Sequence, residues 1–154
     1  MAGIGFTNSS TPGYELWNYD GFNRVKGYRN ATTEALYTYK VGGLRTSKTV
    51  NGQTINHIWD GSHMVMETDE SKQVLDKYYR GRGLVKSDSN GYYLFNAHGD
   101  VIQMADQQGL VTNSYLYDAF GVEKTNNIND TNKFRYAGEY YDQERSLIYL
   151  RARY

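Results

Sequence analysis

Short stretches in which apolar and polar side chains alternate run along most of the chain. Residues 44–50 (LRTSKTV) are one example, and a period of two residues is typical of β-strands. The Asn-Gly pairs at 51–52 and 90–91 are strong signals for two-residue hairpin turns. Residues 70–79 contain good helix formers, but they lack an apolar stripe with a period of 3.6 residues. The pattern therefore predicts an all-β protein of short strands and tight turns.

A unit made of an aromatic residue and a turn returns along the chain at intervals of 16 to 24 residues. Gly and Asn follow the aromatic residue closely in most units, and they readily adopt the left-handed backbone of a tight turn. The repeated aromatic residues are Tyr19, Tyr39, Trp59, Tyr79, Phe95, Tyr117 and Tyr141. The expected turn residues are Asp20, Asn23, Gly43, Asp60, Gly83, Gly99, Asp118, Gly121 and Asp142. We expect stacked antiparallel β-hairpin repeats that form a curved or spiralling sheet.

Tyrosine dominates the composition and changes the expected core. The chain has 16 Tyr among 154 residues, so much of its 39% hydrophobic content is amphipathic. Rings and charged groups alternate on both faces of segments such as 134–141. We therefore expect a sheet that is wetted on both faces and held by cross-strand ring pairs, each contributing about 0.2–1 kcal/mol. Residues 125–132 (TNNINDTN) break the alternation and predict the longest loop.

The charge balance excludes several classes of partner. The 17 basic residues equal the 17 acidic residues, so we expect neither nucleic acid nor an anionic membrane as the main partner. The chain has no Cys, which excludes disulfides and cysteine-ligated metals. It has no apolar run long enough for a membrane span, and we expect no membrane insertion.

No residue pattern indicates catalysis. His57 and His63 could face each other on a hairpin, but two imidazoles without a third ligand make a poor metal site. The acidic pairs at 69–70 and at Asp142 with Glu144 fall in predicted turns, where carboxylates commonly cap and face solvent. Nucleophile and phosphate-loop motifs are missing from the sequence. We therefore expect no enzyme, no catalytic, cofactor or metal-binding residue, and no cofactor.

Residues 77–86 combine four basic side chains with Tyr78 and Tyr79. Such a group could stack on bases or sugars. The alternative, which we favour, is a cross-strand ladder of ion pairs with the acidic stretch at 67–70.

Several segments resemble the YD repeats of rearrangement-hotspot (RHS) proteins. These are WNYDGFNRV at 17–25, YTYKVGGLR at 37–45 and YLYDAFGVE at 115–123. Residues 92–154, which include FRYAGEYYD and YLRARY, resemble the start of the RHS-associated core. The chain departs from the family at 144–147, where Glu-Arg-Ser-Leu replaces the usual Glu-Thr-Gly-Leu. The resemblance divides the chain into a tail or cloning remnant at 1–13 and a β-sheet region at 14–154, with YD repeats at 14–91 and the core at 92–154.

The resemblance implies a bacterial polymorphic toxin. In that family a β-sheet strip forms a hollow shell around a C-terminal toxin. The expected function is then a non-enzymatic scaffold, with the remainder of the shell and the toxin cargo as partners, in a secreted or cell-surface protein. A carbohydrate-binding module that uses exposed Tyr and Trp platforms is the alternative. Open sheet edges also predict self-association of the chain.

Overall fold

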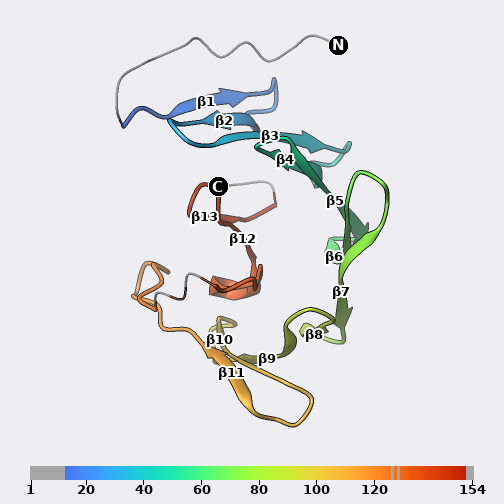
Figure 1. Cartoon of the computed structure of the whole chain (residues 1–154), viewed down its shortest axis with the longest axis vertical. Coiled ribbons are helices and arrows are strands. Elements are labelled where there is room, and N and C mark those ends of the chain that lie inside the picture. Colours follow the sequence, from blue (N-terminus) through green and yellow to red (C-terminus); the bar gives the residue numbers. More distant parts are fainter. Residues whose placement is uncertain (1–12, 126, 128, 152–154) are drawn as a thin grey trace.

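The computed structural model describes residues 13–125, 127 and 129–151. The expected all-β fold is confirmed: eleven strands form one antiparallel sheet in which each strand pairs with the next along the chain. The strands follow one another around an open arc (Figure 1). Their bounds are β1 Leu16–Tyr19, β2 Val25–Arg29, β3 Glu34–Tyr39, β4 Arg45–Val50, β5 Gln53–Asp60, β6 His63–Thr68, β7 Val74–Arg80, β8 Leu84–Ser87, β9 Gly91–Phe95, β10 Val101–Ala105 and β11 Val111–Ser114.

The sheet curves because its register shifts once in nearly every repeat. Shifts fall at Tyr19, Tyr39, Trp59 and Arg80, each just before a turn on the same rim. A β-bulge increases the local right-handed twist and bends its strand. Further shifts at Thr68 and Ala105 precede turns on the opposite rim, so bulges at both rims contribute to the bend of the strip.

Some repeated aromatic residues hold this curvature by reaching back to the preceding repeat. The Tyr39 hydroxyl donates to the Val25 carbonyl at 2.6 Å, and Trp59 Nε1 donates to the Arg45 carbonyl at 2.7 Å. The Tyr117 hydroxyl donates to the Val101 carbonyl at 3.0 Å. Other members of the repeat lie outside the core: 50% of the Tyr19 surface and 47% of the Tyr79 surface are exposed.

The repeated turns share one hydrogen-bond pattern. Asp20 Oδ1 accepts from two backbone amides of its own turn, at 2.9 and 3.0 Å, and Asp118 Oδ1 does the same. This capping accounts for the recurrence of Asx residues in the repeat. Asp60, in contrast, is the last residue of strand β5.

Four of the nine predicted turn residues have a left-handed backbone. Asn23, Gly43, Gly99 and Gly121 have φ angles of 60°, 88°, 95° and 80°. Gly83 lies in its turn without a left-handed φ, because a three-residue bend joins Gly81 N–H to the Gly83 carbonyl.

The C-terminal part of the chain folds back into the arc. It comprises the 3₁₀ turn η1 Tyr136–Gly138 and the hairpin of β12 Tyr140–Asp142 and β13 Leu147–Tyr149, which lies inside the curve of the sheet (Figure 1). Phe134, Tyr140 and Tyr149 pack there against a core that contains Met64 and Tyr78. The expectation of a sheet wetted on both faces is therefore wrong, because this segment covers the concave face.

Ring contacts occur both within the sheet and between the sheet and the C-terminal segment. Trp17 and Tyr28 are cross-strand partners with ring centroids 4.7 Å apart, as expected for a ladder. The Tyr78–Phe134 pair at 4.9 Å and the Phe134–Tyr140 pair at 5.7 Å instead join the C-terminal segment to the sheet or to itself. Aromatic packing therefore fixes the fold-back as well as the sheet.

Three remaining expectations concern the ends and the loop. The described residues of 125–132 contain no strand, as the loop prediction implied. The stretch without strands is longer than predicted: the described residues of 115–135 contain only isolated bridges. The proposed tail at 1–13 lies outside the described residues except for Gly13. Strands β1 and β11 are the two ends of the sheet order, and self-association through them stays a prediction. In the described part of the chain, no helix has the length and apolarity to cross a membrane.

Candidate functional site

A cluster of buried charges joins the sheet to the C-terminal hairpin. The Asp142 carboxylate accepts two hydrogen bonds from the Arg45 guanidinium, at 2.6 and 2.8 Å. It accepts a third from Arg145 Nη2 at 2.6 Å. Lys48 Nζ lies 3.4 Å from Asp142 and 3.0 Å from Glu144. We call Arg45, Lys48, Asp142, Glu144 and Arg145 the charged cluster.

Asp142 is ionised within this cluster. Burial opposes its charge, but Arg45 and Lys48 outweigh burial and hold the pKa of the carboxyl well below its usual value. Asp142 does begin a turn, since its carbonyl accepts from Arg145 N–H at 3.1 Å, but the prediction of Asp142 and Glu144 as a solvated pair is wrong. Asp142 ends β12 and is fully buried, because three cations meet it from two elements. Ser146, with φ of 53°, takes the left-handed position in this turn that the sequence comparison assigned to Gly.

A second buried group adjoins the charged cluster. Glu67 accepts hydrogen bonds from the Tyr78 hydroxyl at 2.7 Å and the Tyr140 hydroxyl at 2.6 Å. His57 Nε2 lies 3.5 Å from Glu67. Burial, with Arg45 and Lys48 nearby, lowers the pKa of His57 well below its usual value, so this imidazole is neutral.

The cavity next to these buried groups is too small for a substrate. The neighbouring cavity beside Arg80 and Tyr140 has a volume of about 20 Å³, which is the space of a water molecule. His57 and His63 do not face each other: His57 pairs in register with Glu67, and His63 pairs with Asp60. Among the described residues, no group of three or more His, Cys, Asp or Glu could hold a metal ion.

His98 lies at an open turn on the rim. Its Nδ1 is 2.8 Å from Asp100 Oδ1, and 61% of its side chain is exposed. Burial opposes the charge of Asp100, but hydrogen bonds from Ala137 N–H and Asn96 keep its pKa below the usual value. The same bond from Ala137 ties this turn to the C-terminal segment at 2.8 Å.

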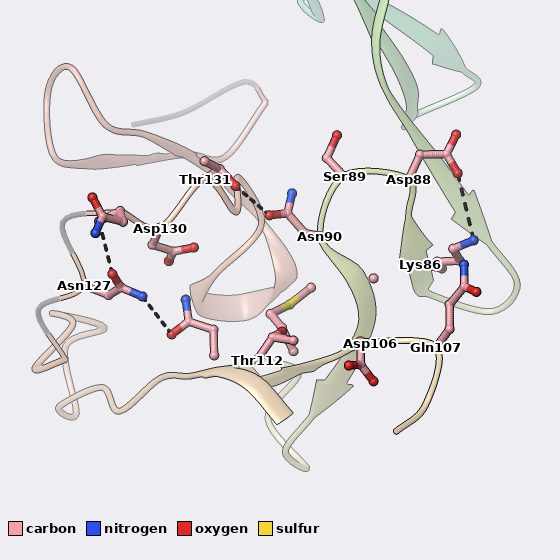
Figure 2. Close-up of a pocket in the computed structure, with 14 residues that line it drawn as sticks. Lys86, Asp88, Ser89, Asn90, Asp106, Gln107, Thr112, Asn127, Asp130 and Thr131 are labelled. Carbon is pink, nitrogen blue, oxygen red and sulfur yellow. Dashed lines mark hydrogen bonds and ion pairs between the residues drawn. The ribbon is translucent and has the colours of Figure 1, made fainter. Parts of the chain in front are cut away.

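A larger polar cavity lies at the rim of the sheet opposite to the turn that contains His98 (Figure 2). Its volume is about 400 Å³, within the range of small-ligand sites. Four separate segments line it, and most of their side chains carry amides, hydroxyls or carboxylates. We call this cavity the polar pocket; its lining is Lys86, Asp88, Ser89, Asn90, Gly91, Met104, Asp106, Gln107, Thr112, Asn113, Asn127, Asn129, Asp130 and Thr131.

Side-chain hydrogen bonds from Asn127 and Thr131 reach the sheet across the polar pocket. Thr131 Oγ1 donates to Asn90 Oδ1 at 2.8 Å (Figure 2). Asn127 Nδ2 donates to Asn113 Oδ1 at 3.4 Å, and Asn127 Oδ1 accepts from the Asn129 backbone at 3.1 Å. Asp130 is held from behind by Arg135 at 3.0 Å. The walls are therefore fixed while the space between them stays open.

The polar pocket suits a ligand with a polar but weakly charged surface. One Lys faces three Asp, so a phosphate alone would be poorly held. Asn and Gln side chains present one donor and one acceptor edge, which matches the hydrogen-bonding edges of nucleobases. Sequence reasoning missed this site. Its signal was the Asn and Thr content of 125–132, which predicts only a loop.

The predicted ion-pair ladder between 67–70 and 77–86 is wrong. Lys77 pairs in register with Met66, and Glu67 faces Asp76. Within the described part of the chain, no ion pair joins the two stretches; Lys86 instead approaches Asp88 at 4.0 Å. The alternation of the strands turns Glu67 inward, where the hydroxyls of Tyr78 and Tyr140 bind it.

Three curated proteins are similar to most of this chain. They are named the tRNA3(Ser)-specific nuclease WapA of Bacillus spizizenii, the tRNA(Glu)-specific nuclease WapA of Bacillus subtilis subsp. natto and the tRNA nuclease WapA of Bacillus subtilis strain 168. Each is 40% identical over 131 residues, which cover 78% of this chain and 6% of the relative. The chain thus spans a small fraction of the length of these relatives. No family model matches it.

These relatives correct the functional expectations. Proteins named as tRNA nucleases contradict the identification as an RHS shell segment, the toxin-encapsulating scaffold, the carbohydrate-binding alternative and the expectation that no enzyme is involved. The expectation that nucleic acid is not a partner stays a prediction, since net charge averages over the surface and says nothing about one site. The secreted or cell-surface location stays a prediction.

Proposed function

We propose that this chain is a segment of a tRNA nuclease of the WapA kind, and that it holds RNA at the polar pocket. The single observation that carries the proposal is the 40% identity to three proteins named as tRNA nucleases. Because the chain spans 6% of each relative, we assign RNA binding to this segment and cleavage to the nuclease as a whole. This replaces the expectation that nucleic acid is not a partner.

The polar pocket supports the proposal through its chemistry. Its amides come from Asn90, Gln107, Asn113, Asn127 and Asn129. Amide groups can pair with the Watson–Crick or Hoogsteen edge of an unpaired base, and carboxylates can accept from a ribose 2′-hydroxyl. A cavity of this kind fits the unpaired loops of a folded RNA better than its helical stems.

Fluorescence anisotropy of labelled tRNA, titrated with the chain, tests the proposal. Gln107 is exposed at the polar pocket, so Gln107→Ala should leave the fold intact and weaken binding about two- to tenfold, the worth of one hydrogen bond. Gln53→Ala is the control, since Gln53 is also an exposed amide and begins β5, distant in sequence from the polar pocket. We expect this control to bind as the unaltered chain does. Absence of tRNA binding, or equal losses in both variants, would contradict the proposal.

A further inference from the structure

Three side chains form a row on the outer face of the sheet, next to the polar pocket. Tyr79 in β7 pairs in register with Lys86 in β8, and Lys86 pairs with Tyr92 in β9. Their strand neighbours Tyr78 and Tyr93 are buried, so the alternation of the strands turns Tyr79 and Tyr92 outward. We call Tyr79, Lys86 and Tyr92 the stacking platform.

The stacking platform combines two partly exposed rings with one cation that lies over both of them. Lys86 Nζ lies 5.4 Å from the Tyr79 ring centroid and 5.9 Å from the Tyr92 ring centroid. Tyr79 is 47% exposed and Tyr92 is 40% exposed. Lys77, two residues before Tyr79 in the same strand, is exposed as well. Aromatic surface and positive charge therefore occur together, while Lys86 also lines the polar pocket.

We propose that the stacking platform binds single-stranded RNA, with bases stacked on Tyr79 and Tyr92 and a phosphate held by Lys86. This inference rests on the proposed function and names the form of RNA. The two tyrosines are two strands apart, so their rings are separated by about 10 Å, with Lys86 between them. That order of ring, cation and ring matches the order of base, phosphate and base along a nucleic-acid strand.

The same features disfavour a duplex. A helix hides its base faces in the stack and presents mainly phosphates and sugars, which bind to positive charge. The platform has one cation between its rings. Asp88, 4.0 Å from Lys86 Nζ, partly neutralises the charge of this cation. The exposed ring surface is thus the larger part of what this surface offers, and only unpaired bases can stack on it.

The test compares fluorescein-labelled oligouridylate with an RNA duplex of equal length in anisotropy titrations. We expect the single strand to bind at least tenfold more tightly than the duplex. Tyr92→Leu removes the ring and should weaken single-strand binding by about fivefold or more, whereas Tyr92→Phe keeps the ring and should bind as the unaltered chain does. Tyr19→Ala is the control for an equally exposed tyrosine elsewhere in the repeat. Circular dichroism establishes that each variant is folded.

The contribution of Lys86 has its own readout. Lys86→Gln should lower the slope of log affinity against log salt by about 0.7, the value for one phosphate contact on a single strand. Equal affinity for duplex and single strand, or equal losses in Tyr92→Leu and Tyr92→Phe, would overturn the inference. If Gln107→Ala weakens tRNA binding while Tyr92→Leu does not, the platform alone fails. If Tyr92→Leu weakens it while Gln107→Ala does not, the polar pocket fails and the platform stands.

Discussion

The charged cluster and the polar pocket are both built from polar side chains of distant segments. They differ in that the cluster is buried, whereas the pocket encloses open space. In the charged cluster, Asp142 is fully buried and its oxygens are taken by Arg45, Lys48 and Arg145. In the polar pocket, hydrogen bonds fix the walls around about 400 Å³ of open space. The charged cluster uses its polar groups in ion pairs that hold the C-terminal hairpin against the sheet. The polar pocket leaves polar groups facing a space that a ligand can enter.

The largest effect should come from opening the charged cluster. Asp142→Ala leaves three buried cations without their shared anion, and we expect a loss of about 3–5 kcal/mol in the free energy of unfolding. Chemical denaturation measures it. Glu34→Ala is the control, because Glu34 meets Arg29 at 4.0 Å on the surface and an exposed pair contributes about 0–1 kcal/mol. Similar losses for both substitutions would mean that a buried ion pair contributes no more to the free energy of unfolding than an exposed one, which would contradict the account of the charged cluster.

Two turns test whether the C-terminal segment restrains the rim that it touches. A Cβ on Gly121 would lie 2.7 Å from the Tyr136 ring, whereas a Cβ on Gly43 would meet nothing within 4 Å. Both residues have left-handed φ angles, of 80° and 88°. Gly43→Ala should therefore cost about 1 kcal/mol from backbone strain alone, and Gly121→Ala about 2–3 kcal/mol. Thermal melts of the two variants decide; equal melting temperatures would exclude a tight contact at Tyr136.

Mild acid should weaken the closed region through His57. Its pKa is depressed in the folded state, so the unfolded chain binds a proton at higher pH than the folded chain does. Stability should therefore fall as the pH drops below about 6.5, by at most about 1.4 kcal/mol per pH unit. His57→Gln should abolish this loss between pH 6.5 and 5. The depressed pKa of Asp142 adds a separate loss only below about pH 4. Unfolding titrations at each pH give the comparison, and an unchanged slope in His57→Gln would show that another group titrates.

The smallest stability effect should occur at the polar pocket. Thr131→Val removes the exposed bond from Thr131 Oγ1 to Asn90 Oδ1, and the freed amide oxygen can bind water. The free energy of unfolding should fall by less than about 1 kcal/mol. Urea denaturation measures the change. A loss as large as that of Asp142→Ala would show that the polar pocket is a part of the stabilising core.

The sheet could be predicted from the sequence because its information is local. Alternation at 44–50 and the Asn-Gly pair at 51–52 specify strands and a turn between neighbours, and each strand pairs with the next. The repeat of Tyr39 and Trp59 also marks the positions of the register shifts. These features depend on a few adjacent residues.

The fold-back and both polar regions depend on contacts between distant residues. Arg45 meets Asp142 across 97 positions, and nothing near either residue specifies the other. Repeat phase places Asp142 at the start of a turn, as it does Asp20 and Asp118, but it does not show that the Asp142 side chain is buried among cations. The polar pocket draws on four segments, so its amides are separate loop residues until the sheet curves and gathers them.

The most direct test of the account is a nuclear magnetic resonance titration of the isotope-labelled chain with tRNA. Amide signals of Asn90, Gln107, Asn113 and the neighbouring Tyr92 should shift in proportion to bound RNA, while those of Arg45, Asp142 and Arg145 should stay unchanged. That result would assign RNA to the open polar region and structure to the closed one. Shifts concentrated at the charged cluster, or none anywhere at saturating tRNA, would contradict the account.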